Sequence, residues 1–127
     1  MIRFLKIAFA VCVPLMMGIQ QHSVSVHIDS MTLTVYPRVV QPGASIRLTC
    51  RVPRHKSNRA VTWGFDNWTS TTRQLDGVYA RVTWESVFDH VPCDPGRAFC
   101  EVWRVEARNQ RVSQEVIVVG CDGEKTE

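Results

Sequence analysis

The chain has 127 residues, which is enough for one domain of ordinary size and too few for two. Its 45% hydrophobic and 21% charged residues are typical of a folded domain and exclude a disordered chain. The 15 Lys and Arg residues outnumber the 12 Asp and Glu residues, but Arg3 and Lys6 lie close to the N-terminus. Without these two the balance is 13 against 12, which excludes a surface with general affinity for nucleic acid.

Residues 1–21 have the pattern of a secretory signal, because a basic start precedes an apolar run over 7–19. A helix over that run spans about 20 Å, short of the roughly 30 Å of a bilayer core. We therefore expect a signal-type helix, either a signal peptide or, if uncleaved, a signal-anchor that is the chain's contact with a membrane. Cys12 suggests a lipidated N-terminus as an alternative, but the residues before it depart from the small-residue pattern that such processing needs.

The rest of the chain is predicted to be an antiparallel β domain. After an N-terminal extension over 22–30, short segments alternate apolar and polar side chains and are separated by frequent turn signals. These segments are 32–36, 45–51, 60–65, 98–107 and 111–119, with a brief crossing segment at 67–77. Such alternation, with many Val and Thr residues, is typical of half-buried strands. The sequence predicts an all-β domain over 31–121, most simply a sandwich, and a polar tail over 122–127.

Four cysteines remain once the signal segment is set aside, an even number for an oxidising compartment. They are Cys50, Cys93, Cys100 and Cys121. Three pairings are open to them. Their spacing, even with His90, lacks the paired short intervals of zinc modules and is wider than the Cys-x-x-Cys of redox pairs. We therefore expect disulfides, and neither a metal nor a cofactor.

The order Cys50, Trp63, Asp94-x-Gly96-x-x-x-Cys100 resembles the immunoglobulin superfamily, and "PGASIRLTC" at 42–50 is similar to that family's entry into strand B. The resemblance covers about residues 31–119. It implies an immunoglobulin-like sandwich of about seven strands, in the shorter constant or intermediate arrangement. It also implies a Cys50–Cys100 bridge between strands B and F, with Trp63 of strand C packed on it.

The same resemblance implies a second bridge. Cys93 falls in the turn between strands E and F, and Cys121 follows strand G, which runs back to the same end of such a sandwich. The pairing Cys93–Cys121 follows from that arrangement. Ala98 stands where the family usually has a tyrosine that braces this turn, so the second bridge has a structural purpose.

Catalysis has little support in the sequence. The four histidines, His22, His27, His55 and His90, and the many serines fall in no nucleophile-elbow pattern or comparable motif. We expect a protein that is not an enzyme, with no catalytic, cofactor-binding or metal-binding residues.

Local charge is the feature that favours partner binding. The segment "RVPRHKSNR" at 51–59 joins strands B and C, and the turn between F and G is also basic. The expected partner-binding residues are Arg51, Arg54, Lys56, Arg59, Arg108 and Arg111. In an immunoglobulin-like sandwich these loops share one end, so they would attract an acidic glycan or an acidic protein patch. The alternative is an ordinary solvated loop.

Trp103 also points to a partner surface. It shares the parity of Phe99, opposite to Cys100, and should therefore face outward on the C-F-G sheet, where an exposed aromatic suits recognition. The alternative is that side chains of a neighbouring strand cover it.

A sequon, Asn67-Trp68-Thr69, makes Asn67 a candidate glycosylation site in a eukaryotic secretory route.

These observations favour an exported recognition or adhesion module that binds a protein or acidic glycan, with no specific affinity for nucleic acid. We expect it to be secreted or extracytoplasmic, in the periplasm, at the cell surface or on a virion. The alternative is a structural or decorative domain of a virion, for example of a phage, or of a cell surface. The resemblance carries this expectation, because a fold alone does not determine function.

Overall fold

The computed structural model describes residues 22–121 except 29 and 76–81. The expected signal-type helix over 1–21, with Cys12, and the polar tail over 122–127 lie outside the described residues. The described part of the chain contains no helix long and apolar enough to cross a membrane.

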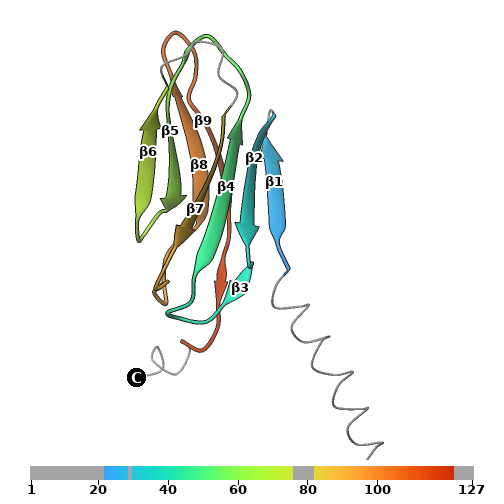
Figure 1. The fold of residues 1–127 in the computed structure, drawn as a ribbon, viewed down its shortest axis with the longest axis vertical. Helices are drawn as coiled ribbons and strands as arrows, with labels where there is room; N and C mark the ends of the chain where they lie inside the picture. The colour runs from blue at the N-terminus through green and yellow to red at the C-terminus, as the bar shows by residue number, and fades with distance from the viewer. Residues whose placement is uncertain (1–21, 29, 76–81, 122–127) are drawn as a thin grey trace, which may run out of the picture.

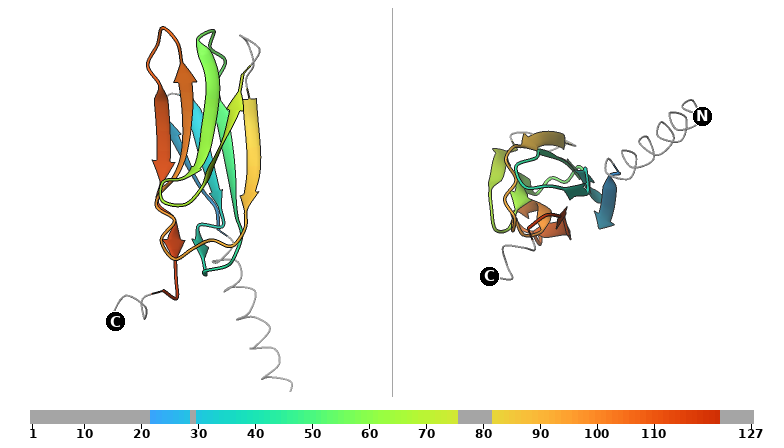
Figure 2. Two further views of the ribbon diagram at one scale, coloured as in Figure 1. Left: turned by 90° about the vertical axis from the view of Figure 1, so that its left-hand side faces the viewer. Right: turned by 90° about the horizontal axis from the view of Figure 1, so that it is seen from below.

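Two four-stranded antiparallel sheets face each other (Figures 1 and 2). The first has the order β1-β2-β4-β7, with β1 (Val24–Ile28), β2 (Met31–Tyr36), β4 (Ile46–Val52) and β7 (Val82–Phe88). The second has the order β6-β5-β8-β9, with β6 (Ser70–Gln74), β5 (Asn58–Phe65), β8 (Ala98–Arg104) and β9 (Gln110–Gln114). A short parallel pair, β3 (Val39–Val40) with β10 (Ile117–Val118), lies at one end. The predicted all-β class with antiparallel sheets is confirmed.

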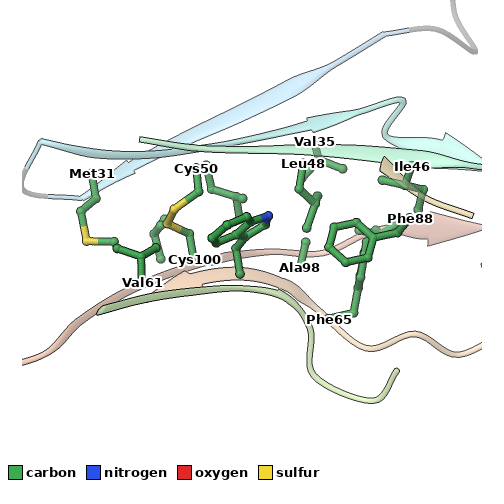
Figure 3. Packing of buried hydrophobic residues seen from close by; sticks show 14 of the residues in the cluster. Met31, Val35, Ile46, Leu48, Cys50, Val61, Phe65, Phe88, Ala98 and Cys100 are labelled. Atoms are coloured by element: carbon green, nitrogen blue, oxygen red, sulfur yellow. A yellow bond between two sulfur atoms is a disulfide. The ribbon is translucent and has the colours of Figure 1, made fainter. Parts of the chain in front are cut away.

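The core lies between the two sheets because alternate side chains of facing strands point inward (Figure 3). On β4 every second residue is buried, including Ile46, Leu48 and Cys50, and the residues between them are exposed or, at Thr49, half-buried. On β8 the inward residues Ala98, Cys100 and Val102 are fully buried, as their parity predicts. The period-two pattern of the sequence therefore identifies the inner face of both strands.

Aromatic rings fill the space around the central residues. Trp63 of β5 is buried and stacks on Trp84 of β7, with ring centroids 5.3 Å apart. Towards one end, Phe65 meets Phe88 edge to face at 5.3 Å. Trp68 packs against both of these phenylalanines. The rings therefore join the two sheets across much of the core.

Both expected cysteine pairs are confirmed. Cys50 and Cys100 join β4 to β8 across the two sheets, and Cys93 and Cys121 join the β7–β8 loop to the segment after β10. In each pair the Cα atoms are 5.8 Å apart. Two disulfides are typical of a chain that folds in an oxidising, extracytoplasmic environment.

The described residues form ten strands, more than the approximately seven that the resemblance implies. Residues 24–28, expected as part of an extension, form β1 and pair antiparallel with β2. Residues 70–74, expected as a crossing segment, form β6 and pair with β5. Both are edge strands. The sequence of β6, STTRQ, contains no apolar residue, whereas that of β1, VSVHI, does alternate apolar and polar residues.

Candidate recognition surfaces

Two loops that are distant in sequence lie side by side at one end of the molecule, the β4–β5 loop (53–57) and the β8–β9 loop (105–109) (Figure 1). We call this end the rim. The amide of Val105 donates to the carbonyl of Ser57 over 2.9 Å, which joins the loops directly. Buried Asn58 donates to Pro53 O over 3.0 Å, and its Oδ1 accepts from Arg104 Nε over 2.9 Å. The rim is therefore held together by hydrogen bonds.

A serine and a histidine meet within the rim. His55 Nδ1 accepts from the amide of Ser57 over 3.1 Å and lies 2.5 Å from its hydroxyl oxygen. The serine is only 5% exposed, so its hydroxyl faces the loop rather than solvent. This contact shapes the turn that leads into β5.

Three basic residues of the rim extend into solvent. Arg54 and Lys56 are exposed on one loop, and Arg108 is exposed on the other. None of the ion pairs between described residues involves them. One acid, Glu106, is exposed in the same loop as Arg108 and reduces the net positive charge of the rim without reversing it.

The other expected basic residues take different places. Arg59, at a bulge of β5, turns back and donates to the carbonyls of Lys56 and Asn58 over 3.0 and 2.9 Å. Arg51 is exposed on β4, where it pairs with outward-facing residues of β2 and β7. Both residues therefore lie near the rim, but the side chain of Arg59 is hydrogen-bonded to the backbone of its own loop.

Arg111 does not belong to the rim. It is the second residue of β9, opposite Glu101, to whose Oε1 it donates over 2.9 Å. It also pairs with Asp66, and its guanidinium lies 4.0 Å from the centroid of the Phe99 ring. That cover explains why Phe99 is buried although its parity points outward.

Trp103 faces outward, as its parity predicts, and is 44% exposed. Its Nε1 donates to Thr62 Oγ1 over 3.0 Å, and Thr62 bonds in turn to Thr72 over 2.8 Å. Its direct neighbour across the strands is Ala60, a small residue that leaves room for the indole on the sheet. Since Arg104 and Asn58 are the next pair along these strands, Trp103 adjoins the rim. We call Arg54, Lys56, Arg108 and Trp103 the rim surface.

Thr62 and Asn58 contribute to this surface but were not predicted from the sequence. Thr62 alternates with Trp63 in β5, so its outward position was available from parity. Asn58 carries no such signal, because a polar residue in a polar loop is normally solvated and only the structure shows that it is buried.

Asn67 lies at the opposite end of the molecule, in the turn between β5 and β6. It is exposed, and its amide donates to Pro95 O over 2.9 Å, so its backbone is fixed against the β7–β8 loop. An open groove of 380 Å³ lies at that end too, between residues 93–97 and 115–118.

Among residues 22–28, 30–75 and 82–121, no group of three or more His, Cys, Asp or Glu side chains is placed to hold a metal ion. Comparison of the chain with protein-family models, with curated proteins and with solved structures finds no match.

Proposed function

We propose that the chain is an exported immunoglobulin-like recognition module that binds an acidic protein or glycan through the rim surface, without catalysis. The observation that carries the proposal is that Arg54, Lys56 and Arg108 are exposed on two loops joined by the Val105–Ser57 hydrogen bond, at the end of the sheet on which the indole of Trp103 is exposed. Cations attract an acidic partner over some distance, and an aromatic side chain supplies contact area at low entropic cost.

The immunoglobulin-like part of the proposal is supported by the disulfide between the two sheets and by Trp63 directly opposite Cys100. The parallel pairing of β3 with β10, beside otherwise antiparallel sheets, suits a short arrangement of that kind. The order of the strands places β4, β7 and β2 in one sheet and β5, β8 and β9 in the other.

The direction in which the chain leaves the fold also suits recognition. The first described residue, His22, accepts a hydrogen bond at its carbonyl from the amide of Arg38. The last described residue, Cys121, is bound to Cys93 by a disulfide. Both positions lie at the end away from the rim (Figure 1). A larger assembly that holds the domain by either terminus would therefore leave the rim surface accessible.

Charge reversal at the rim tests the proposal. The variant Arg54→Glu/Arg108→Glu changes one cation in each loop, and Arg38→Glu/Arg73→Glu makes the same change of charge at exposed positions elsewhere. We expect binding to a panel of sulfated, sialylated and neutral oligosaccharides, and to proteins of the natural surroundings, to fall about tenfold or more for the rim variant alone. Equal binding by wild type and rim variant, or equal loss in both variants, would contradict the proposal. Purification with assembled particles that survives the rim substitutions would instead favour the structural or decorative role.

A further inference from the structure

Among the described residues, β1 pairs with β2 alone, and it carries no acidic, lysine or arginine side chain. The two sheets have four edge strands, and three of them carry a charged residue: Glu85 on β7, Arg73 on β6 and Arg111 on β9. The sequence of β1, VSVHI, contains no acidic or basic residue other than one histidine, and no proline or glycine. Proteins normally protect exposed edges with charge, proline or bulges, because an unprotected edge pairs with other strands. Figure 1 shows β1 as the outermost strand of its sheet.

The conformation of β1 is already that of a paired strand. All five of its residues are in register with β2, so one side of its backbone is used. On the outer face, Ser25 bonds to Thr34 over 2.8 Å and His27 bonds to Thr32 over 2.9 Å. Because each strand has hydrogen-bonding groups on both sides, the other side of β1 keeps donors and acceptors for a further strand.

We propose that β1 pairs with β1 of a second copy of this chain, antiparallel and about a two-fold axis at Val26. In that register Val24 lies opposite the partner subunit's Ile28, and Ser25 opposite the partner subunit's His27. Apolar residues then meet apolar ones, and polar residues meet polar ones, with no opposed like charges. Ile28 is 44% exposed in the single chain, and pairing covers it.

This self-complementarity is the reason to choose a second copy rather than a foreign strand. A two-fold contact requires that the same short segment match its own reversed sequence, and the five residues of β1 do so around their central valine. The β1-β2-β4-β7 sheet of one copy and the same sheet of the second copy then become one continuous sheet across the dimer. Because the two β1 strands run in opposite directions, the rims of the two subunits point to opposite ends.

The dimer does not depend on the proposed function, but the two together have a consequence. Two rim surfaces at opposite ends make a bivalent particle that can bridge two partner surfaces.

Cysteine cross-linking tests the register. In the full chain with Cys12→Ser, Val26→Cys places the new thiol opposite itself on the two-fold axis, whereas Ile28→Cys places it opposite Val24. We expect a disulfide-linked dimer from Val26→Cys on a non-reducing gel, and none above background from Ile28→Cys, although residue 28 is the more exposed of the two. Cross-linking of Ile28→Cys with none of Val26→Cys would overturn the register.

The oligomeric state tests the interface itself. We expect sedimentation equilibrium to give a dimer for the wild-type full chain at concentrations on the order of 100 μM. The substitution Ile28→Lys should raise the dissociation constant of the dimer about tenfold or more, because a lysine on an edge strand opposes pairing with another strand. The control, Val87→Lys, changes a residue that is 57% exposed on β7, the other edge of the same sheet, and should leave the dimer intact. A wild-type monomer, or equal dissociation of both variants, would overturn the proposal whether or not the rim surface binds its partner.

Discussion

Gly64 occupies a position where only a hydrogen atom fits. It lies on β5 beside the turn into β6, and a Cβ atom built there would lie 2.3 Å from Thr69 O and 2.4 Å from Ser70 Cα. Both contacts are with backbone, which a side-chain rotation cannot relieve. Gly43 differs, because its φ of +88° favours glycine while a Cβ atom there would meet nothing within 4 Å.

Alanine substitution at these two glycines compares the cost of steric overlap, at Gly64, with the cost of an unfavourable backbone conformation, at Gly43. Gly43→Ala should lower the free energy of unfolding by about 1–2 kcal/mol, the cost of a left-handed conformation. Gly64→Ala should lower it by more than about 3 kcal/mol, because the β5–β6 hairpin must open to accept the methyl group. Urea unfolding followed by circular dichroism measures both values. A smaller loss at Gly64 than at Gly43 would contradict this account.

Trp63 is the other residue whose environment decides its role. It is nearly fully buried between Cys100 and Trp84, and its Nε1 has no hydrogen-bond partner among the described residues. A buried, unpaired donor costs about 1–3 kcal/mol. The ring therefore stabilises the core through packing and stacking rather than through its polar atom.

Two substitutions of Trp63 should separate the contribution of the packed ring from that of the unpaired indole nitrogen. Trp63→Ala should lower the free energy of unfolding by about 3–5 kcal/mol, through lost burial and a cavity. Trp63→Phe should cost less than half as much, because it keeps an aromatic ring and removes the unpaired donor. Denaturant titration of the two variants under the same conditions provides the comparison. Equal losses would show that the indole nitrogen is hydrogen-bonded.

At the scale of elements, the β7–β8 loop is held by a disulfide and by backbone hydrogen bonds. Ala98, two residues before Cys100, is fully buried, and its methyl side chain cannot form a hydrogen bond that would brace the turn. The loop is held instead by the Cys93–Cys121 disulfide and by hydrogen bonds between Val91 and residues 43 and 44, of 2.8 and 3.0 Å. A covalent bond and a backbone pairing therefore fix this loop without a side-chain hydrogen bond from position 98.

Removal of this disulfide should loosen one end of the molecule only. The bridge spans 28 residues, which corresponds to about 3.5 kcal/mol in the loop-entropy treatment. We expect Cys93→Ala/Cys121→Ala to lower the free energy of unfolding by about that amount and to speed amide exchange at 89–97. Binding through the rim surface should be unchanged, because the rim lies at the other end. Loss of binding in a folded variant would show that the two ends are coupled.

At the scale of the whole molecule, charge is arranged in two ways. On the outer face of the second sheet, Arg111 is neutralised by Glu101 and Asp66. At the rim, Arg54, Lys56 and Arg108 are exposed, with no ion pair between described residues to neutralise them. Only the second arrangement presents charge to a partner, since a cation already paired gains little from another acid.

The salt dependence of binding should therefore identify the rim. Screening shortens the range of exposed charges from about 8 Å at physiological salt to about 3 Å at 1 M. We expect the dissociation constant for an acidic partner to rise steadily with salt concentration in the wild type. The slope should be much reduced in Arg54→Glu/Arg108→Glu and retained in Arg111→Gln. Titration calorimetry across a salt series supplies these slopes, and an unchanged slope in the rim variant would contradict the assignment.

Much of this architecture follows from local sequence. The alternation around Cys50 and Cys100 identifies inward and outward positions because a strand repeats every two residues, and the same rule places Trp103 outside. The cysteine pairs followed from the family resemblance and were confirmed. The edge strands β1 and β6 were not recognised as strands. The sequence STTRQ of β6 has no apolar residue to mark a buried face, whereas the alternation VSVHI of β1 was available and was assigned to an N-terminal extension.

What the sequence alone determined was therefore the β class and the buried face of the central strands, since these depend on spacing along the chain. Only the tertiary structure decided which basic residues reach the rim. Arg108 and Arg111 are equivalent as sequence, but Arg108 lies in the β8–β9 loop, whereas Arg111 lies on β9 beside Glu101 and Asp66. It also decided that β1 completes the sheet as an open edge, because pairing between strands is a contact that no local pattern encodes.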